Sequence, residues 1–500
     1  MTNILKSLII SLLLVGNASA TTYYIAANGL DANNGTSKST PWLHAPGMFG
    51  ATGNPYAYTP QAGDQFILRG GDTWYSNGTS KTPVGVPWQW IASWNGTSSS
   101  RIYIGVDKTW YAGASWTKPV LSGGNPLNTN FVSSCTYHIV PSCYLGADNG
   151  KACSSDSGCG AGQCALDYLR VHWAQYVTVD NIEFTGMCSD ASQEETYLQA
   201  SQSGSPTQNN IYENLYMHGW TMTTLSATQQ NDGIGIIGDS SGAGSNQFLY
   251  NTIDGTDSYP YAFQMHLWDC YDVENSTYRY AGQGIVCNNN HIFHNNLIEL
   301  IYNTTKPSAH SNGFEFNSEY SSAGANLIYN NIVRNCTAAV TTWIQPNTSV
   351  NTYFYNNLIY GNIQQAVDVD TTNGGNTYFI NNTFESNSQT PIGGGSALTN
   401  GTFYIYNNHC INTAGACAKV SGATINNLTN LVETETVSTA AGYTTSNLYM
   451  PTSASSPTVR QGTNEYFYST TDILGNSRPS SGAWDIGAYE FKIPSAPTMF

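Results

Sequence analysis

Four short segments of the sequence share one pattern, and that pattern decides the fold. They are "LIYNNIVRN" (327–335), "YFYNNLIYGN" (353–362), "YFINNTFESN" (378–387) and "YIYNNHCIN" (404–412). Each has alternating apolar or aromatic residues followed by a pair of asparagines. The second asparagines are 26, 25 and 26 residues apart, at Asn331, Asn357, Asn382 and Asn408. This spacing predicts a repeated structural unit. Less regular versions begin near residue 168, and their longer spacings indicate inserted loops.

The period inside each segment favours strands over helices. A helical repeat places apolar residues three and four apart, whereas these segments alternate with period two and are rich in Ile, Val, Phe, Tyr and Thr. Glycine and asparagine between the strands allow sharp, partly left-handed corners. An asparagine amide stacked on the next coil donates to and accepts from backbone groups that would otherwise stay unpaired. We therefore predict a parallel β-solenoid in which the four asparagines occupy equivalent corners as a ladder.

Segments near both ends carry a resemblance to a known group of proteins. "TYYIAANGLDANNGTSKSTPWLHA" (22–45), "AGDQFILRGGDTW" (62–74) and the closing "DILGNSRPSSGAWDIGAYEF" (472–491) are similar to the entry and exit segments of secreted right-handed parallel β-helix repeat proteins, the superfamily typified by pectate lyases. The resemblance implies an all-β fold: a single right-handed parallel β-helix of about ten coils with terminal caps. We expect this domain to span residues 21–491, with a C-terminal cap at 433–491 and a tail at 492–500.

The first twenty residues read as an export signal. Residues 1–20 have Lys6 near the start, an apolar run from Leu8 to Val15, and the small-residue ending Ala18-Ser19-Ala20. No later stretch approaches the roughly 18 uncharged apolar residues of a membrane span. We expect a protein secreted to the extracellular space or cell surface, not integral to the membrane, and monomeric.

The charge balance argues against a polyanion-binding surface spread over the whole protein and leaves a local cationic pocket open. Only 10% of the residues are charged, and the 32 acidic residues outnumber the 16 Lys plus Arg, giving a net charge of −16. Such a surface repels phosphate backbones, so we expect no nucleic acid partner.

Cysteines are concentrated in one part of the chain. Eleven are present, and five of them fall within thirty residues. In an exported protein this density favours a disulfide-bonded insertion at about residues 133–166. The candidates are Cys135, Cys143, Cys153, Cys159 and Cys164, with Cys188 as a sixth partner. Their pairing is open, and the alternative of a zinc site lacks CxxC pairs.

The alternation of apolar and polar residues along several strands also predicts one polar face as the functional surface. Strands at 232–237, 263–268, 313–317, 340–343 and 366–370 place apolar residues such as Ile234, Ile236 and Val340 inside. If these strands stack on one sheet, their outward residues become neighbours. Those residues are Asp232, Gln264, His266, Glu315, Trp343, Asp368 and Asp370, with His310 just before its strand.

These residue types suit a polysaccharide groove, because indole stacks on sugar rings while carboxylates and imidazole bind hydroxyls or move protons. The candidate catalytic residues are His310, Glu315, His266, Lys306 and Arg334, and the candidate substrate-binding residues are Asp232, Gln264, Trp343 and Asp368. Lys306 and Arg334 are the candidate bases for β-elimination of a uronate, unless they pair with Glu319 or Glu315. Asp368 and Asp370, with Asp232, are candidate calcium ligands; otherwise no cofactor is expected. Polar outward residues also arise by default on any solenoid.

Two classes of function follow from the resemblance. The first is a secreted carbohydrate-active enzyme, either a polysaccharide lyase or a glycoside hydrolase. The second is a non-catalytic surface or matrix protein that binds glycans or serves as a rigid structural element. The GHG and RIK strings of polygalacturonase-like proteins do not occur, and neither do the HExxH or P-loop motifs. For the enzyme and for the glycan-binding protein alike, the expected partner is a polysaccharide.

Overall fold

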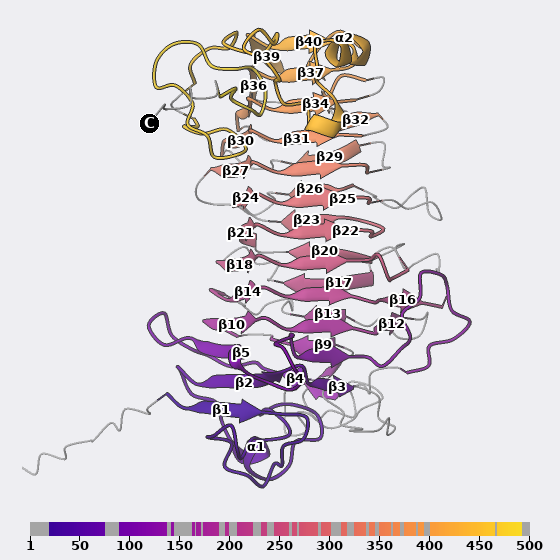
Figure 1. The fold of residues 1–500 in the computed structure, drawn as a ribbon, viewed down its shortest axis with the longest axis vertical. Helices are drawn as coiled ribbons and strands as arrows, with labels where there is room; N and C mark the ends of the chain where they lie inside the picture. Colours follow the sequence, from indigo (N-terminus) through magenta and orange to yellow (C-terminus); the bar gives the residue numbers. More distant parts are fainter. Residues whose placement is uncertain are drawn as a thin grey trace, which may run out of the picture.

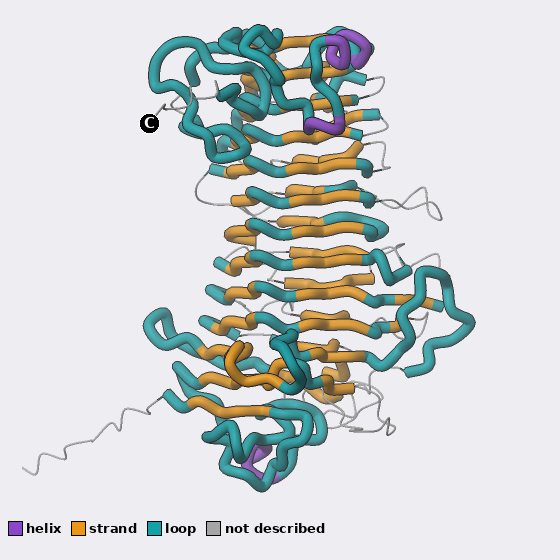
Figure 2. Tube along the Cα trace, in the orientation of Figure 1, coloured by secondary structure: helices purple, strands orange, loops and turns teal. Residues whose placement is uncertain are grey.

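The chain winds into an elongated solenoid whose coils stack along its long axis (Figures 1 and 2). The computed structural model describes residues 20–75, 90–137, 142–144, 163–165, 167–171, 174–189, 196–199, 208–223, 232–237, 245–259, 263–267, 270–288, 292–301, 312–317, 325–336, 340–345, 350–361, 364–370, 375–386, 389–394, 401–465 and 468–492. In a few strands only the backbone is described. The N-terminal coils lie at one end and the C-terminal segment packs at the other (Figure 1).

Three long parallel sheets run the length of the solenoid, and we number them in the order in which each coil passes through them. Sheet 1 has 13 strands: β1 (Thr22–Ile25), β2 (Gln65–Gly70), β5 (Ile102–Tyr111), β10 (Val177–Asp180), β14 (Ile211–Glu213), β18 (Asn246–Leu249), β21 (Cys270–Glu274), β24 (Ile292–His294), β27 (Asn326–Tyr329), β30 (Thr352–Tyr355), β33 (Thr377–Ile380), β36 (Thr402–Tyr406) and β39 (Thr424–Leu428).

Sheet 2 has 12 strands: β3 (Thr73–Tyr75), β6 (Val120–Ser122), β11 (Glu183–Thr185), β15 (Tyr216–His218), β19 (Thr252–Asp254), β22 (Thr277–Arg279), β25 (Leu297–Glu299), β28 (Ile332–Arg334), β31 (Leu358–Tyr360), β34 (Thr383–Glu385), β37 (His409–Ile411) and β40 (Leu431–Glu433). Sheet 3 has 11 strands: β4 (Trp90–Ile91), β9 (Asp167–Arg170), β13 (Thr196–Gln199), β17 (Asp232–Ile237), β20 (Phe263–Leu267), β23 (Ile285–Asn288), β26 (Phe314–Asn317), β29 (Val340–Gln345), β32 (Gln365–Val369), β35 (Ile392–Gly394) and β38 (Ala418–Val420).

A few short elements lie outside the three long sheets. They are the helices α1 (Gly53–Ala57) and α2 (Glu435–Ala440), the 3₁₀ turn η2 (Thr445–Asn447), the parallel pair β12 (Cys188–Ser189) and β16 (Thr221–Met222), and the antiparallel pair β7 (Ser142–Tyr144) and β8 (Gln163–Ala165). Because strands of successive coils pair in parallel in all three sheets, the predicted right-handed parallel β-helix is confirmed, with 11 to 13 strands per sheet in place of about ten coils.

The asparagine ladder is present at the corner between sheets 1 and 2. Asn331, Asn357, Asn382 and Asn408 are all buried. The backbone N–H of each donates to the side-chain oxygen of the next, at 3.0 Å from Asn331 to Asn357 and 2.9 Å from Asn357 to Asn382. The first asparagine of each pair has a left-handed backbone conformation, as in Asn356 with φ 55°. The pair therefore combines a residue that tolerates the turn with one that satisfies buried backbone groups.

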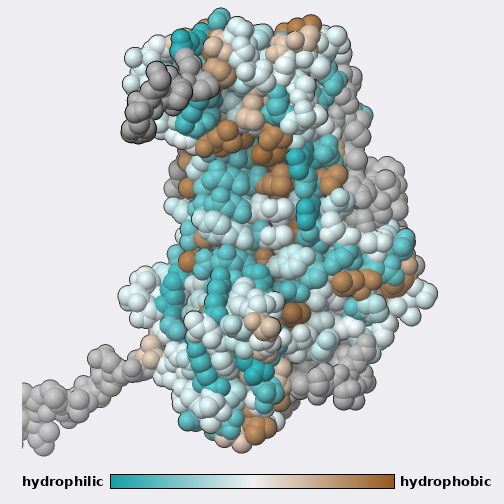
Figure 3. Space-filling view, in the orientation of Figure 1, coloured by the Kyte–Doolittle hydropathy of each residue, from teal (hydrophilic) through white to brown (hydrophobic). Residues whose placement is uncertain are grey.

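The core consists of apolar residues aligned in register across coils. On sheet 3, the buried residues Met265, Ile285 and Phe314 follow one another in register, and the buried polar residue Thr342 continues the row. The view in Figure 3 shows a mostly hydrophilic outer surface with small, separate apolar patches. The described part of the chain contains no helix long and apolar enough to cross a membrane.

The predicted core positions of β17 are confirmed in part. Ile234 is buried as expected, but the pairing of β17 with β20 shifts register between Gly233 and Gly235. The shift puts Gly235, not Ile236, opposite the core residue Met265. An irregularity of this kind interrupts the alternation of a strand. The side chain of Ile236 lies outside the described structure, so its inward orientation stays a prediction.

Disulfides confirm part of the cysteine prediction. Cys135 is bonded to Cys188, across a sequence separation of 53, and Cys410 is bonded to Cys417. Cys143 and Cys164 lie opposite each other in the backbone register of β7 and β8. Cys153 and Cys159 lie outside the described residues. The predicted insertion is thus tied to the solenoid through Cys188.

Residues of the C-terminal cap pack against the same corner as the ladder. The buried Arg478 donates to Asn356 Oδ1 at 2.9 Å and to Glu490 at 3.0 Å. Asn381 donates to the carbonyl of Asp485 at 2.8 Å. The left-handed asparagines therefore also anchor the segment that covers this end of the solenoid.

Candidate functional site

The five strands predicted to form one face do lie on one sheet. They correspond to β17, β20, β26, β29 and β32 of sheet 3 (Figure 1). An additional strand, β23, lies between β20 and β26. Sequence reasoning missed β23 because its outward position is the apolar Val286, which breaks the polar alternation.

Backbone register aligns four of the predicted residues in a single row across the strands. We call this the Glu315 row, and from one coil to the next it comprises His266, Val286, Glu315, Trp343, Asp368, Gly393 and Lys419. Neighbouring positions in such a row are about 4.8 Å apart along the solenoid. Trp343 and Asp368 are partly exposed, and Lys419 is exposed. Lys419 was not predicted, because its pairing with Gly393 cannot be read from alternation alone.

Glu315 is less exposed than expected. It is 8% exposed, and Gln283 Nε2 donates to its Oε2 at 3.2 Å. Its neighbours in the row, Val286 and Trp343, flank it on both sides. Glu315 is therefore a nearly buried carboxylate on the outer side of the sheet, and Gln283, which donates to it, was not among the predicted residues.

Asp368 lies two strands from Glu315 and has a different environment. Burial raises the pKa of its carboxyl above the usual range, and the nearby charge of Asp370 adds to this effect. Gln365 Nε2 lies 3.4 Å from Asp368 Oδ1. A carboxyl with a raised pKa holds its proton at higher pH, which suits a general acid.

The remaining predicted residues of this face are less closely placed. Asp232 belongs to β17, five strands from Asp368 in β32, which corresponds to about 24 Å. Asp232 therefore does not share a calcium ion with Asp368 and Asp370, because calcium ligands lie within about 2.6 Å of the ion. Calcium at Asp368 and Asp370 stays a prediction. The side chains of Asp232, Gln264 and His266, and all of Lys306 and His310, lie outside the described structure.

Arg334 is not on this face. It lies in β28 of sheet 2, within a row of alternating charge. Arg334 Nε donates to Glu299 at 2.7 Å and Nη1 donates to Tyr360 at 3.0 Å, while Arg279 contacts Asp254 at 2.5 Å and Glu299 at 3.7 Å. Although burial alone would lower it, the pKa of Arg334 is raised by its hydrogen bonds to Tyr360 and Glu299.

The position of Arg334 removes it from the list of candidate bases. A guanidinium with a raised pKa does not accept a proton at ordinary pH. Its carboxylate partner among the described residues is Glu299 and not Glu315, and the other suggested partner, Glu319, lies outside the described residues. The alternation of Asp, Arg, Glu and Arg in one register row is visible only once the coils are aligned, so the sequence carried no signal for it.

Sheet 2 also holds a histidine fixed by two carboxylates. His218 Nδ1 lies 2.7 Å from Asp257 and Nε2 lies 3.1 Å from Glu183. Burial opposes the charged form, but the hydrogen bonds to the two carboxylates outweigh it and raise the pKa of His218 to about 9. Each ring nitrogen thus donates to its own acceptor, which is the arrangement of a stable imidazolium.

This histidine predicts a pH dependence of stability. A folded pKa raised to about 9 means that the stabilisation by His218 is complete below its unfolded pKa and is lost as pH rises through about 9. The wild type should therefore lose a few °C more of melting temperature between about pH 7 and pH 10 than the His218→Gln variant. Thermal unfolding followed by circular dichroism tests this. Parallel curves for the two proteins would contradict it.

The chain matches some solved structures at low sequence identity and low structural similarity. No protein-family model and no curated protein sequence matches the chain. Among solved structures, pectate lyase Pel9A is 15% identical over 95% of this chain and 98% of its own, with a TM-score of 0.47. XylC in complex with xylose is 11% identical over 94% and 98%, with a TM-score of 0.40. A lacto-N-biosidase from Eubacterium ramulus is 13% identical over 83% and 68%, with a TM-score of 0.37. Similarity this low assigns no activity.

Proposed function

We propose that the outer face of sheet 3 binds a polysaccharide along the solenoid axis and hydrolyses it. The observation that carries this proposal is the Glu315 row, in which Glu315, Trp343 and Asp368 occupy consecutive strands in register. A linear polysaccharide laid along this face meets an equivalent position about every 4.8 Å. The partly exposed indole of Trp343 offers a surface for stacking a sugar ring between the two carboxyl groups.

The two carboxyl groups take different roles. Asp368, whose pKa is raised by burial, is the general acid that protonates the leaving oxygen. Glu315, oriented by Gln283, is the base that activates water. Their strands, β26 and β32, are two positions apart in the sheet, about 9.6 Å along the solenoid axis. This spacing resembles the roughly 6.5–9.5 Å between carboxyl groups of inverting hydrolases more than the about 5–5.5 Å of retaining ones.

Two further features support this proposal. Lys419 places an exposed positive charge at one end of the row, which favours a substrate with acidic sugars. The disulfides Cys135–Cys188 and Cys410–Cys417 favour an oxidising, extracellular location, where polysaccharides are found.

A panel of neutral and acidic polysaccharides tests this function. Each is incubated with the purified protein, and the products are assayed for reducing ends and for the absorbance of unsaturated uronates. We expect new reducing ends without unsaturation, from at least one substrate, and inversion of the anomeric centre by NMR. Unsaturated products would instead identify a lyase. Binding without any product would identify a non-catalytic glycan-binding protein.

A further inference from the structure

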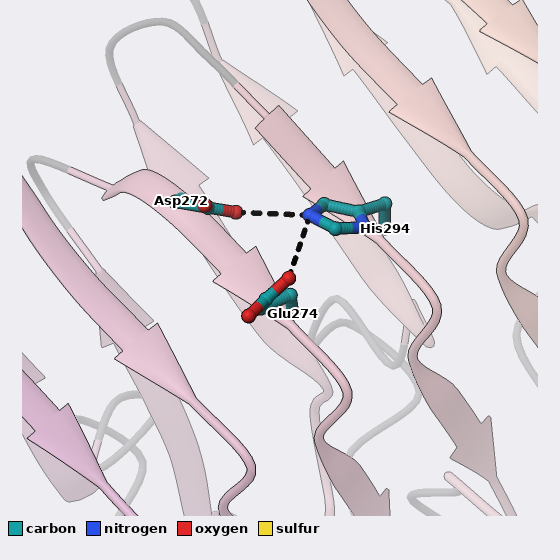
Figure 4. A group of neighbouring side chains, drawn as sticks. All are labelled: Asp272, Glu274 and His294. Atoms are coloured by element: carbon teal, nitrogen blue, oxygen red, sulfur yellow. Dashed lines mark ion pairs between the residues drawn. The ribbon is translucent and has the colours of Figure 1, made fainter.

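Three side chains on the outer face of sheet 1 form a second cluster, apart from the Glu315 row. Asp272 and Glu274 project from β21, and His294 projects toward them from β24 (Figure 4). His294 Nε2 lies 3.2 Å from Asp272 Oδ1 and 3.1 Å from Glu274 Oε2. The three ligand atoms all lie within 4.8 Å of one another. Both carboxylates therefore converge on one ring nitrogen.

This arrangement differs from that of His218. An imidazolium holds two carboxylates best by donating one N–H to each, as His218 does with Asp257 and Glu183. His294 instead has both carboxylates at Nε2, and its single N–H there serves only one oxygen at a time. In the described part of the chain, the buried atoms Asp272 Oδ1 and His294 Nδ1 have no hydrogen-bond partner. A carboxylate oxygen is thus left without a donor at the point where the cluster converges, and this is costly in a buried site.

A divalent metal ion satisfies the same three atoms. Ligand atoms that sit about 2.1 Å from zinc and subtend roughly 100° at it are about 3.2 Å apart. The two distances from His294 Nε2, 3.2 and 3.1 Å, match this separation. One imidazole and two carboxylates are ligands of first-row transition metals such as zinc, whereas calcium favours a set made only of oxygens.

The strands around the cluster hold it in place. Glu274 is paired directly with His294 in the register of β21 and β24, so two of the three ligands are neighbours across one strand pair. The ring of Tyr329 stacks on the ring of His294, with centroids 4.7 Å apart and planes 9° apart. The His294 residue is 9% exposed, so its orientation is set before any ion arrives. The Asp272 and Glu274 side chains are 17% and 20% exposed, which leaves an entry path and room for water ligands.

We propose that Asp272, Glu274 and His294 bind a zinc-type divalent cation that joins β21 to β24 on the outer face of sheet 1. Both carboxylates then contact the positively charged ion instead of sharing the single N–H of His294 Nε2, and the charge of the ion neutralises them. This site is independent of the Glu315 row, because it lies on another sheet. Its test is therefore a binding measurement and needs no substrate.

The experiment uses the full chain, stripped with a chelator and titrated with zinc chloride by isothermal calorimetry, with bound metal counted by elemental analysis. We expect one zinc per chain at this site, and no comparable heat with calcium chloride. His294→Gln and Asp272→Asn should each weaken zinc binding at least about tenfold. Zinc should raise the melting temperature of the wild type but not of His294→Gln.

The matched control is His218→Gln, because His218 also contacts one aspartate and one glutamate. It should bind zinc as the wild type does. Circular dichroism confirms that each variant is folded, and Glu274→Gln provides a third, conservative change if one of the others fails to fold. Absence of zinc binding by the wild type would overturn the proposal. Equal affinity in the wild type and the folded His294→Gln or Glu274→Gln variant would also overturn it, because the ion would then be held elsewhere.

Discussion

Replacement of Asn357 by leucine is expected to lower the free energy of unfolding by about 2–6 kcal/mol. Asn357 Oδ1 accepts from the N–H of Asn331 at 3.0 Å, and its Nδ2 donates to the carbonyl of Ile328 at 2.9 Å. Leucine has a similar size but neither function, so two buried backbone groups lose a partner, and each such loss costs about 1–3 kcal/mol. Urea unfolding monitored by circular dichroism measures the difference.

The control for this prediction is Asn427→Leu. Asn427 lies on β39, the last strand of sheet 1, and its side chain is exposed. Its replacement should change the free energy of unfolding by no more than about 0.5 kcal/mol. If both variants unfold at the same urea concentration as the wild type, the ladder asparagines contribute nothing beyond their shape, and the explanation of the repeat is wrong.

Glu315→Gln and Asp368→Asn are each expected to lower kcat on the hydrolysed polysaccharide about 10²–10⁴-fold, because each removes one proton-transfer group. Each variant replaces a carboxylate by an amide, whose oxygen still accepts the hydrogen bond from the neighbouring glutamine. That glutamine is Gln283 at position 315 and Gln365 at position 368. Alanine at position 315 would mix two effects, since Glu315 is 8% exposed and its loss also leaves Gln283 without an acceptor.

The pH profile separates the two roles. A general acid must be protonated, so the rate should fall as pH rises through the raised pKa of Asp368. This fall should be absent from the residual activity of Asp368→Asn. Asp107→Asn, a change on β5 of sheet 1, should keep wild-type activity. Full activity in both Glu315→Gln and Asp368→Asn would place the chemistry outside the Glu315 row.

The sequence by itself determined the fold, the asparagine ladder and the sheet on which the candidate site lies. These features depend on local patterns: alternation sets which residues of a strand face the core, and paired asparagines mark each corner. The outward phase of Glu315, Trp343 and Asp368 followed from the alternation within each strand, and the three residues share one row in the backbone register of sheet 3.

Only the tertiary structure decided how separate coils meet. The register shift at Gly233, the pairing of Arg334 with Glu299, the distance of Asp232 from Asp368 and the convergence of Asp272, Glu274 and His294 all depend on contacts between residues of different coils. Their alignment is set by backbone hydrogen bonds between coils and by inserted loops of unequal length. No pattern within one strand records that alignment, because the alternation of a strand is the same whichever residue lies beside it in the next coil.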